Sequence, residues 1–268
     1  MTTLLTLDKL CAVVRRDLLT AVRYRTGFAL GTAATLVELA AFYYLSRAIG
    51  PGFRPEGMGY FPFLLVGTGL YTFLVMGIRA FLQAVQEAQQ AGTLETLMTS
   101  VTPAPAIVLL SATSTLLGSM FQLALYFAVG LILFGSEYQV NWLATFATFI
   151  LSLAIVVGLG MLAAALQIAI QKGSAVLWLF GSGAWFLTGT LFPISALPKP
   201  LRIMSDLIPL THSLNAMRPA LLEGASLASI LPVISTLTLF AALLVPVGFV
   251  VFFYALRRAR FNGTLAYY

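Results

Sequence analysis

The chain has 268 residues, of which 60% are hydrophobic and only 9% are charged. An ordinary soluble domain carries about 25% charged residues, so this composition, with a mean hydropathy of +0.96, excludes that class and indicates a polytopic membrane protein. The net charge of +6 fits the orientation of membrane segments better than nucleic-acid binding, and we expect no nucleic-acid partner.

The first predicted element is an amphipathic helix over residues 7–25. Its apolar residues recur at three- and four-residue spacing, and they are Leu7, Leu10, Cys11, Val14, Leu18, Ala21 and Val22. The basic residues of this segment fall elsewhere on the helical wheel. Because the segment is too charged to span a bilayer, we expect an interfacial helix on the cytoplasmic leaflet. The alternative is a simple soluble leader.

Apolar segments long enough to cross the bilayer follow, each near or above the ~20 residues that a span needs. The six predicted spans cover residues 27–49, 60–83, 106–134, 142–170, 174–191 and 227–256. They predict an all-α membrane protein whose single transmembrane domain occupies residues 1–268. Small residues within the spans, Gly27 with Gly31 and Gly158 with Gly160, are expected to permit close approach of helices.

The distribution of basic residues predicts the topology. With the N-terminus inside, ten of the fifteen Lys and Arg residues are cytoplasmic and five are outside. The inner ones are Lys9, Arg15, Arg16, Arg23, Arg25, Arg79, Lys172, Arg257, Arg258 and Arg260. By the positive-inside rule, both termini are therefore predicted to be cytoplasmic. Residues 86–105 and 171–173 then face the cytoplasm, whereas residues 50–59, 135–141 and 192–224 face outward.

Residues 86–105, with the sequence QEAQQAGTLETLMTSVTPAP, form a polar stretch between two apolar spans. The stretch contains Glu87 and Glu95, a glycine at Gly92 and a possible helix cap at Thr93. This composition predicts a short helix at the membrane surface. The alternative is a capped turn that only joins two spans.

The outer stretch 192–224 is neither long enough nor apolar enough for two further spans, yet it shows helical periodicity. One apolar stripe consists of Leu197, Leu201, Met204 and Leu207, and a second of Leu210, Leu214, Met217 and Leu221. Because Pro209 separates the stripes, they predict two short amphipathic helices. We expect these helices to re-enter the outer leaflet and pack in the bundle. Simple surface helices are the alternative.

Motifs for nucleotide binding and catalysis, such as G-x-x-x-x-G-K-[ST], H-E-x-x-H and G-x-S-x-G, do not occur in the sequence. We therefore predict no catalytic residue, no metal site and no cofactor in this chain. His212 is better explained as a hydrogen-bonding cap than as a metal ligand. Glu38, a mid-span carboxylate, either faces a translocation path or pairs with a polar group inside the bundle.

Two motifs then relate the chain to a known family. The first comprises Glu87, the run Gly92-Thr93-Leu94-Glu95-Thr96-Leu97 and Pro103. The second runs from Gly189-x-x-Phe192-Pro193-Ile194-x-x-Leu197-Pro198 to Pro209-Leu210-Thr211-His212, Arg218 and Leu221-Leu222-Glu223-Gly224. In the order and spacing of these residues, and in its six-span layout, the chain resembles the permease subunit of a type-2 ABC exporter over essentially its whole length.

The resemblance implies a role for each motif. Residues 86–105 would form a coupling helix that sits in a groove of a separate ATPase subunit, and the residues implied are Glu87, Gly92, Thr93, Leu94, Glu95 and Leu97. The outer re-entrant helices would close the transport path, and the residues implied in this gate are Phe192, Pro193, Pro198, Pro209, His212 and Arg218. Two ATPase copies carrying ATP and Mg, and a second permease copy or a homologue, would complete the transporter in the bacterial plasma (inner) membrane.

The substrate implied is lipid-like, drug-like or amphipathic, and it would be moved out of the cytoplasm or the inner leaflet. Aromatic residues near the outer ends of the first two spans form either a membrane belt or a stacking surface for sugars. One alternative is therefore a lipid-linked polysaccharide exporter of the same family. The other is a self-sufficient secondary transporter, which would need ion-coupling residues and commonly an inverted repeat.

Overall fold

The structure, a computed structural model, describes residues 25–92, 104–134, 139–170, 174, 178 and 184–262. The regular elements in these ranges are all helical, as the composition predicts. The long helices are α2 (Arg25–Ile49), α3 (Tyr60–Gln90), α5 (Ala104–Phe134), α6 (Trp142–Ile170) and α10 (Leu231–Asn262). The short ones are α8 (Lys199–Asp206), α9 (Pro209–Leu222) and the 3-10 turns η1 (Pro55–Gly57) and η3 (Ile194–Ala196).

Within the described residues, four helices are long and apolar enough to cross a membrane, namely α3, α5, α6 and α10. Helix α6 has the predicted bounds, whereas α3 continues to Gln90 instead of ending at residue 83. Helix α2 covers the predicted first span and has 25 residues, but its membrane placement stays a prediction. The predicted interfacial helix covers residues 7–25, and all of these except Arg25 lie outside the described residues.

The predicted fifth span also lies mostly outside the described residues, and the described end of it differs from the prediction. Residues 184–191 form turns and bends instead of the end of a helix. Gly189 has a positive φ of 76°, a left-handed conformation that ends helical geometry and that glycine adopts at little cost. The Thr188 and Thr190 hydroxyls are hydrogen-bonded to each other at 2.8 Å. The composition of residues 184–191 is typical of a membrane span, but the segment forms a local turn.

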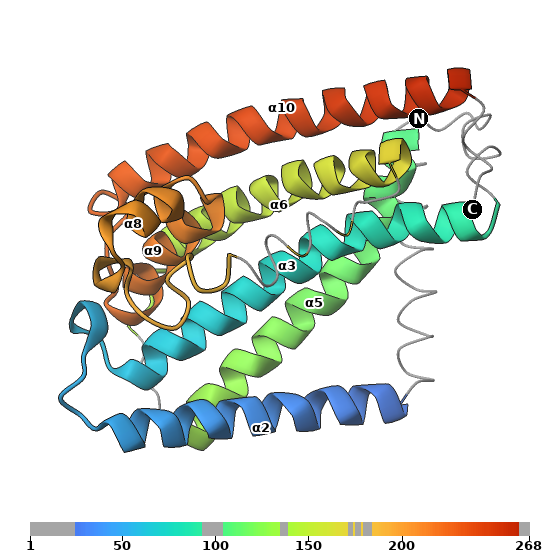
Figure 1. The fold of residues 1–268 in the computed structure, drawn as a ribbon. Coiled ribbons are helices and arrows are strands. Elements are labelled where there is room, and N and C mark those ends of the chain that lie inside the picture. Colours follow the sequence, from blue (N-terminus) through green and yellow to red (C-terminus); the bar gives the residue numbers. More distant parts are fainter. Residues whose placement is uncertain are drawn as a thin grey trace.

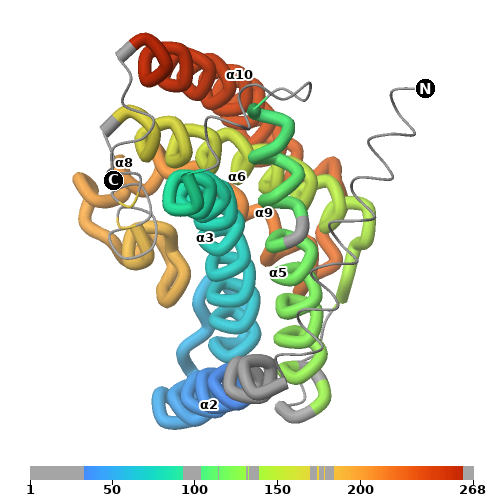
Figure 2. Tube along the Cα trace, turned by 90° about the vertical axis from the view of Figure 1, so that its right-hand side faces the viewer, coloured from blue at the N-terminus to red at the C-terminus, as the bar shows by residue number. Residues whose placement is uncertain are grey.

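The long helices lie side by side in the order α10, α6, α3 and α5, with α2 at the periphery against α3 and α5 (Figure 1). The view turned by 90° shows α2 and α10 on opposite sides of the bundle (Figure 2). The C-terminal half of α2 is held by a small cluster that includes Leu39, Phe61, Leu65 and Tyr126. Helix α2 is therefore attached through a much smaller buried surface than α6 or α10.

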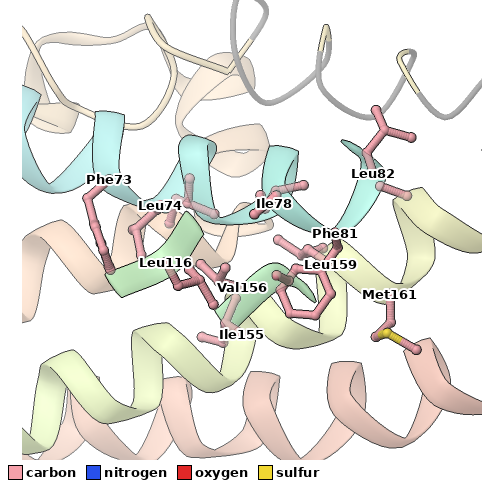
Figure 3. Close-up of a cluster of buried hydrophobic side chains, with 14 of the residues drawn as sticks. Phe73, Leu74, Ile78, Phe81, Leu82, Leu116, Ile155, Val156, Leu159 and Met161 are labelled. Carbon is pink, nitrogen blue, oxygen red and sulfur yellow. The ribbon is translucent and has the colours of Figure 1, made fainter. Parts of the chain in front are cut away.

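Helix α3 lies at the centre of the packing. Its buried side chains, among them Phe73, Leu74, Ile78 and Phe81, pack with Leu116 of α5 and with Ile155, Val156 and Leu159 of α6 (Figure 3). A helix that is apolar around most of its circumference is stable only when neighbours cover it. Burial of α3 by α5, α6 and α9 satisfies that requirement.

Glycines set the closest contacts between helices, as predicted for two of the four positions named. A methyl group on Gly158 of α6 would lie 2.6 Å from the backbone of Leu244 on α10, and one on Gly248 of α10 would lie 2.5 Å from the carbonyl oxygen of Gly158. A methyl group on Gly160 would overlap the ring of Phe81 on α3. The pair Gly27 and Gly31 stays a prediction.

Candidate functional site

The predicted outer and cytoplasmic regions lie at opposite ends of the bundle (Figure 1). At one end gather α8, α9, η1 and the first turns of α10, while α3 ends at the other with Gln90. Residues 192–222 and the described start of the predicted coupling stretch, residues 86–92, thus lie at opposite ends of α3. A function that links the two ends of the bundle has to act through the long helices that join them.

The two short helices follow the predicted periodicity, and α9 begins at Pro209 as predicted. In α9 the apolar stripe is buried, with Leu210 and Leu214 fully enclosed. The stripe of α8 is exposed in a single chain, with exposed fractions of 52% for Met204 and 71% for Leu207, the residue that follows the helix. Helix α9 is therefore part of the bundle core, and α8 lies on its surface.

Arg218 is the central polar residue of the bundle end where α8 and α9 lie. Its guanidinium is buried, and Nη2 donates hydrogen bonds to the carbonyl oxygens of Gly189 at 2.8 Å and Thr190 at 3.1 Å. The guanidinium carbon lies 3.5 Å from the centre of the Phe63 ring on α3, a close cation–π contact. One side chain on α9 thereby joins the 189–190 backbone and α3.

Two further residues shape the surroundings of Arg218. A methyl group on Gly67 of α3 would lie 2.6 Å from the Thr190 carbonyl oxygen and closer still to Arg218 Nη2, so the absence of a side chain there provides the room. Burial lowers the pKa of Arg218 to about 10, and the charge of Glu56 opposes this shift. The guanidinium therefore stays charged near neutral pH. We call Arg218, Phe63, Gly67, Gly189 and Thr190 the Arg218 junction.

Other contacts hold α9 and α8 in place. The backbone N–H of Asn141 donates to Ala220 O at 2.9 Å, and Asn141 Oδ1 accepts from the N–H of Ala144 at 3.2 Å, which caps the start of α6. His212 Nε2 lies 2.8 Å from the carbonyl oxygen of Asp206. The predicted gate residue His212 thus forms a hydrogen bond across the α8–α9 connection.

The remaining predicted gate residues mark the starts of elements. Pro193 precedes η3, Pro198 precedes α8, and Phe192 is half-buried. Arg202 of α8 donates to the Ser195 carbonyl oxygen at 2.6 Å. Together these contacts give the segment from 192 to 222 a defined path between the turn at Gly189 and α9.

At the other end of the bundle, which is predicted to be cytoplasmic, the coupling residues are described only in part. Glu87 lies in the last turn of α3 and is exposed. Gly92 has a positive φ of 65°, which fits a helix end in the left-handed conformation. Thr93, Leu94, Glu95 and Leu97 lie outside the described residues.

A side-chain contact at this end was not anticipated from the sequence. Gln167 Nε2 of α6 donates to Gln89 Oε1 of α3 at 3.1 Å, and Gln167 is only 9% exposed. The amide pair ties α3 to α6 beside the predicted coupling stretch. Such interhelical hydrogen bonds contribute about 0.6 kcal/mol on average in membrane helices.

Glu38 is exposed on α2. No hydrogen bond or ion pair to its carboxylate is present within the described part of the chain. The predicted pairing inside the bundle therefore does not occur among these residues.

Sequence reasoning included Phe63 only among the aromatic residues near the outer ends of the first two spans, and it missed Gly67 and the contact of both residues with Arg218, although the two lie on α3 with the helical spacing i, i+4 that places them on one face. No sequence pattern pointed to their contact with Arg218, because both residue types are common in membrane helices. Glu56, with a positive φ of 56°, was also not singled out.

Comparison with known proteins agrees with this architecture. The profile of the ABC-2 type transporter family matches residues 8–222, which is most of the chain. The chain is also similar to Nodulation protein J of Sinorhizobium fredii (strain NBRC 101917 / NGR234), with 44% identity over 45 residues. That match covers 17% of each protein. Because the family profile extends from the N-terminal segment to the end of α9, this chain belongs to the ABC-2 type transporter family.

Proposed function

We propose that this permease is the transmembrane subunit of an ATP-driven exporter and moves a lipid-like, drug-like or amphipathic substrate out of the cytoplasm or the inner leaflet. We call α8, α9 and the 189–190 turn the outer assembly. The observation that carries the proposal is α3, one continuous helix that runs from this assembly to the predicted coupling stretch. A helix of this kind can convey a displacement over the thickness of the membrane.

The energy source in this proposal is a separate ATPase, present in two copies that hold ATP and Mg. Proteins of this family normally work with such a subunit. We propose that each ATPase contacts residues 86–105, where Glu87 is exposed at the end of α3. A charge-assisted contact there would be worth about 1.5–3 kcal/mol.

A second permease copy or a homologue completes the proposed path. Support comes from α2, whose apolar residues Leu36, Val37, Tyr44 and Leu45 are exposed in the single chain together with Glu38. A path formed between two copies would cover Glu38. We place the complex in the plasma (inner) membrane of a bacterium with both termini in the cytoplasm.

A lipid-linked polysaccharide exporter of the same family is the second candidate, and the aromatic residues at the adjoining ends of α2 and α3 and in the loop between them bear on it. Tyr43 packs edge to face against Phe61, with ring centres 5.5 Å apart, and Phe53 packs in the same way against Tyr60 at 5.0 Å. These rings contact one another, which favours a structural or interfacial role over a sugar-stacking surface.

The test is reconstitution of the permease with its ATPase in proteoliposomes, followed by ATPase measurements across lipids, amphipathic drugs and lipid-linked glycans. We expect stimulation by members of the first two classes. Stimulation by glycans alone would favour the second candidate. Substrate movement that needs an ion gradient and no ATPase would contradict both and favour a secondary transporter.

A further inference from the structure

The Arg218 junction joins segments that are far apart in the sequence. Arg218 on α9 binds the carbonyl oxygens of Gly189 and Thr190 and lies on the ring of Phe63 at the start of α3. The two buried, charged hydrogen bonds fix α9 to the 189–190 turn, and a shift of this unit relative to α3 would break the cation–π contact with Phe63.

Helix α3 is suited to carry that connection across the bundle. It has 31 residues and is therefore about 46 Å long at 1.5 Å per residue. Its single proline, Pro62, lies in the first turn, where proline does not interrupt the helix. At the other end, Gln89 is tied to Gln167 of α6.

We infer that Arg218 is the positioning residue that makes the outer assembly move together with α3, so that a displacement of α3 at Gln90 reaches α9 as rigid-body motion. This inference rests on the proposed function, because an ATPase is needed to displace the inner end of α3. It assigns Arg218 a role in transmission and not in contact with the substrate.

The choice of arginine supports a specific role. Arg218 Nε is buried and has no hydrogen-bond partner among the described residues, so the residue carries a desolvation cost that an apolar side chain would avoid. Gly67 accommodates this side chain by leaving space that any other residue would fill. An apolar residue would fill the volume, but it could not hold both carbonyl groups of the 189–190 turn.

The test is a distance measurement between spin labels on α3 and on the outer assembly. In a Cys11→Ser background, cysteines replace Thr72 on α3 and Glu223 directly after α9, both of which are exposed. The labelled permease is measured in lipid nanodiscs, alone and with its ATPase, without nucleotide and with ATP and vanadate. We expect the mean distance to change by less than about 2 Å on nucleotide binding, the scale of adjustments within a packed unit.

Variants separate transmission from folding. Arg218→Met should widen the distance distribution without nucleotide and shift the mean by more than about 2 Å with it, whereas Arg218→Lys should fall between. Gly67→Ala should behave like Arg218→Met, since the added methyl group displaces the guanidinium. Gly118→Ala is the matched control, because a methyl group there meets nothing within 4 Å.

Two results would overturn the inference: a nucleotide-dependent change above about 2 Å in the unaltered protein, or unaltered distances in Arg218→Met. The first needs no variant, so it is decisive even if Arg218→Met fails to fold. A label pair at Glu87 in two permease copies reports separately on the proposed function. If that pair does not respond to nucleotide, the proposed function fails, and the distribution widths of the permease alone still decide the role of Arg218.

Discussion

Polar side chains are few in this bundle, and several of the buried ones connect two elements. The Thr68 hydroxyl on α3 is hydrogen-bonded to the Tyr126 hydroxyl on α5 at 2.7 Å, and Gln89 and Gln167 connect α3 with α6. Arg218 belongs to the same class but carries a charge. In an apolar environment such contacts specify which helix faces meet, because a shifted arrangement would leave polar groups without partners.

Glu95 is the side chain through which we expect the ATPase contact to be most sensitive. Reversal of its charge in Glu95→Arg should weaken the complex by roughly ten- to a hundredfold, the equivalent of a charge-assisted contact of ~1.5–3 kcal/mol. The measurement is co-purification of the ATPase with permease variants at equal membrane expression. Glu223→Arg, a charge reversal on the exposed residue that follows α9, is the control.

A solvated loop carboxylate would behave differently. Its charge reversal would cost about 0.5 kcal/mol or less and leave the complex intact. Unchanged complex yield together with unchanged ATP hydrolysis in Glu95→Arg would return residues 86–105 to the role of a connecting turn.

Among the helices, α6 and α10 form the closest pair and α2 the loosest. Backbone contact between Gly158 and Gly248 brings α6 and α10 together, while α2 is held by a small cluster around Leu39. This difference in packing predicts that α6 and α10 move as one unit. Any rearrangement between helices should then occur at α2, where the buried surface is smallest.

Gly248→Ala tests the closeness of this pair. The added methyl group would lie 2.5 Å from the Gly158 carbonyl oxygen, so we expect the helices to separate and the free energy of unfolding to fall by about 1–3 kcal/mol. Thermal unfolding in detergent measures the effect. Gly118→Ala on α5, in open space, should be neutral or slightly stabilising through its helix propensity, and equal unfolding temperatures for both variants would contradict the assigned contact.

For the molecule as a whole, the positive-inside rule predicts cytoplasmic termini. A cysteine placed at Tyr268 in a Cys11→Ser background should not react with an impermeant maleimide added to intact cells, and it should react after the membrane is opened. A cysteine at Lys199, in the predicted outer region at the start of α8, is the positive control. Labelling of position 268 from outside would contradict the predicted topology and indicate the opposite orientation.

In the proposed transporter the ATPase subunit binds ATP and the permease does not, which predicts the behaviour of the isolated permease. Because the sequence has no phosphate-binding loop, the purified chain should neither bind nor hydrolyse ATP at physiological concentrations. Equilibrium binding of a fluorescent ATP analogue, with the ATPase subunit as positive control, measures this directly. Saturable binding by the permease alone would refute the prediction.

Much of the architecture was predictable because it depends on local composition. Segments of the length and apolarity of α3, α5, α6 and α10 cross a bilayer whatever their neighbours are. The start of α9 at Pro209 was predictable for a similar reason, since proline lacks the N–H that a helix interior needs. Residues 184–191 were predicted wrongly because hydropathy does not register a turn stabilised by Gly189 and by the contact between Thr188 and Thr190.

The sequence by itself determined the membrane class, the family resemblance and the two polar regions, because these follow from composition and short motifs. Only the tertiary structure decided that Arg218 rests on Phe63 beside Gly67, that Gln89 meets Gln167, and that Glu38 has no partner among the described residues. Hydropathy reports how strongly a segment prefers lipid, but it does not report which face of a helix meets which neighbour. That choice depends on the packing of helices distant in sequence, where a missing methyl group at Gly67 determines whether an arginine fits.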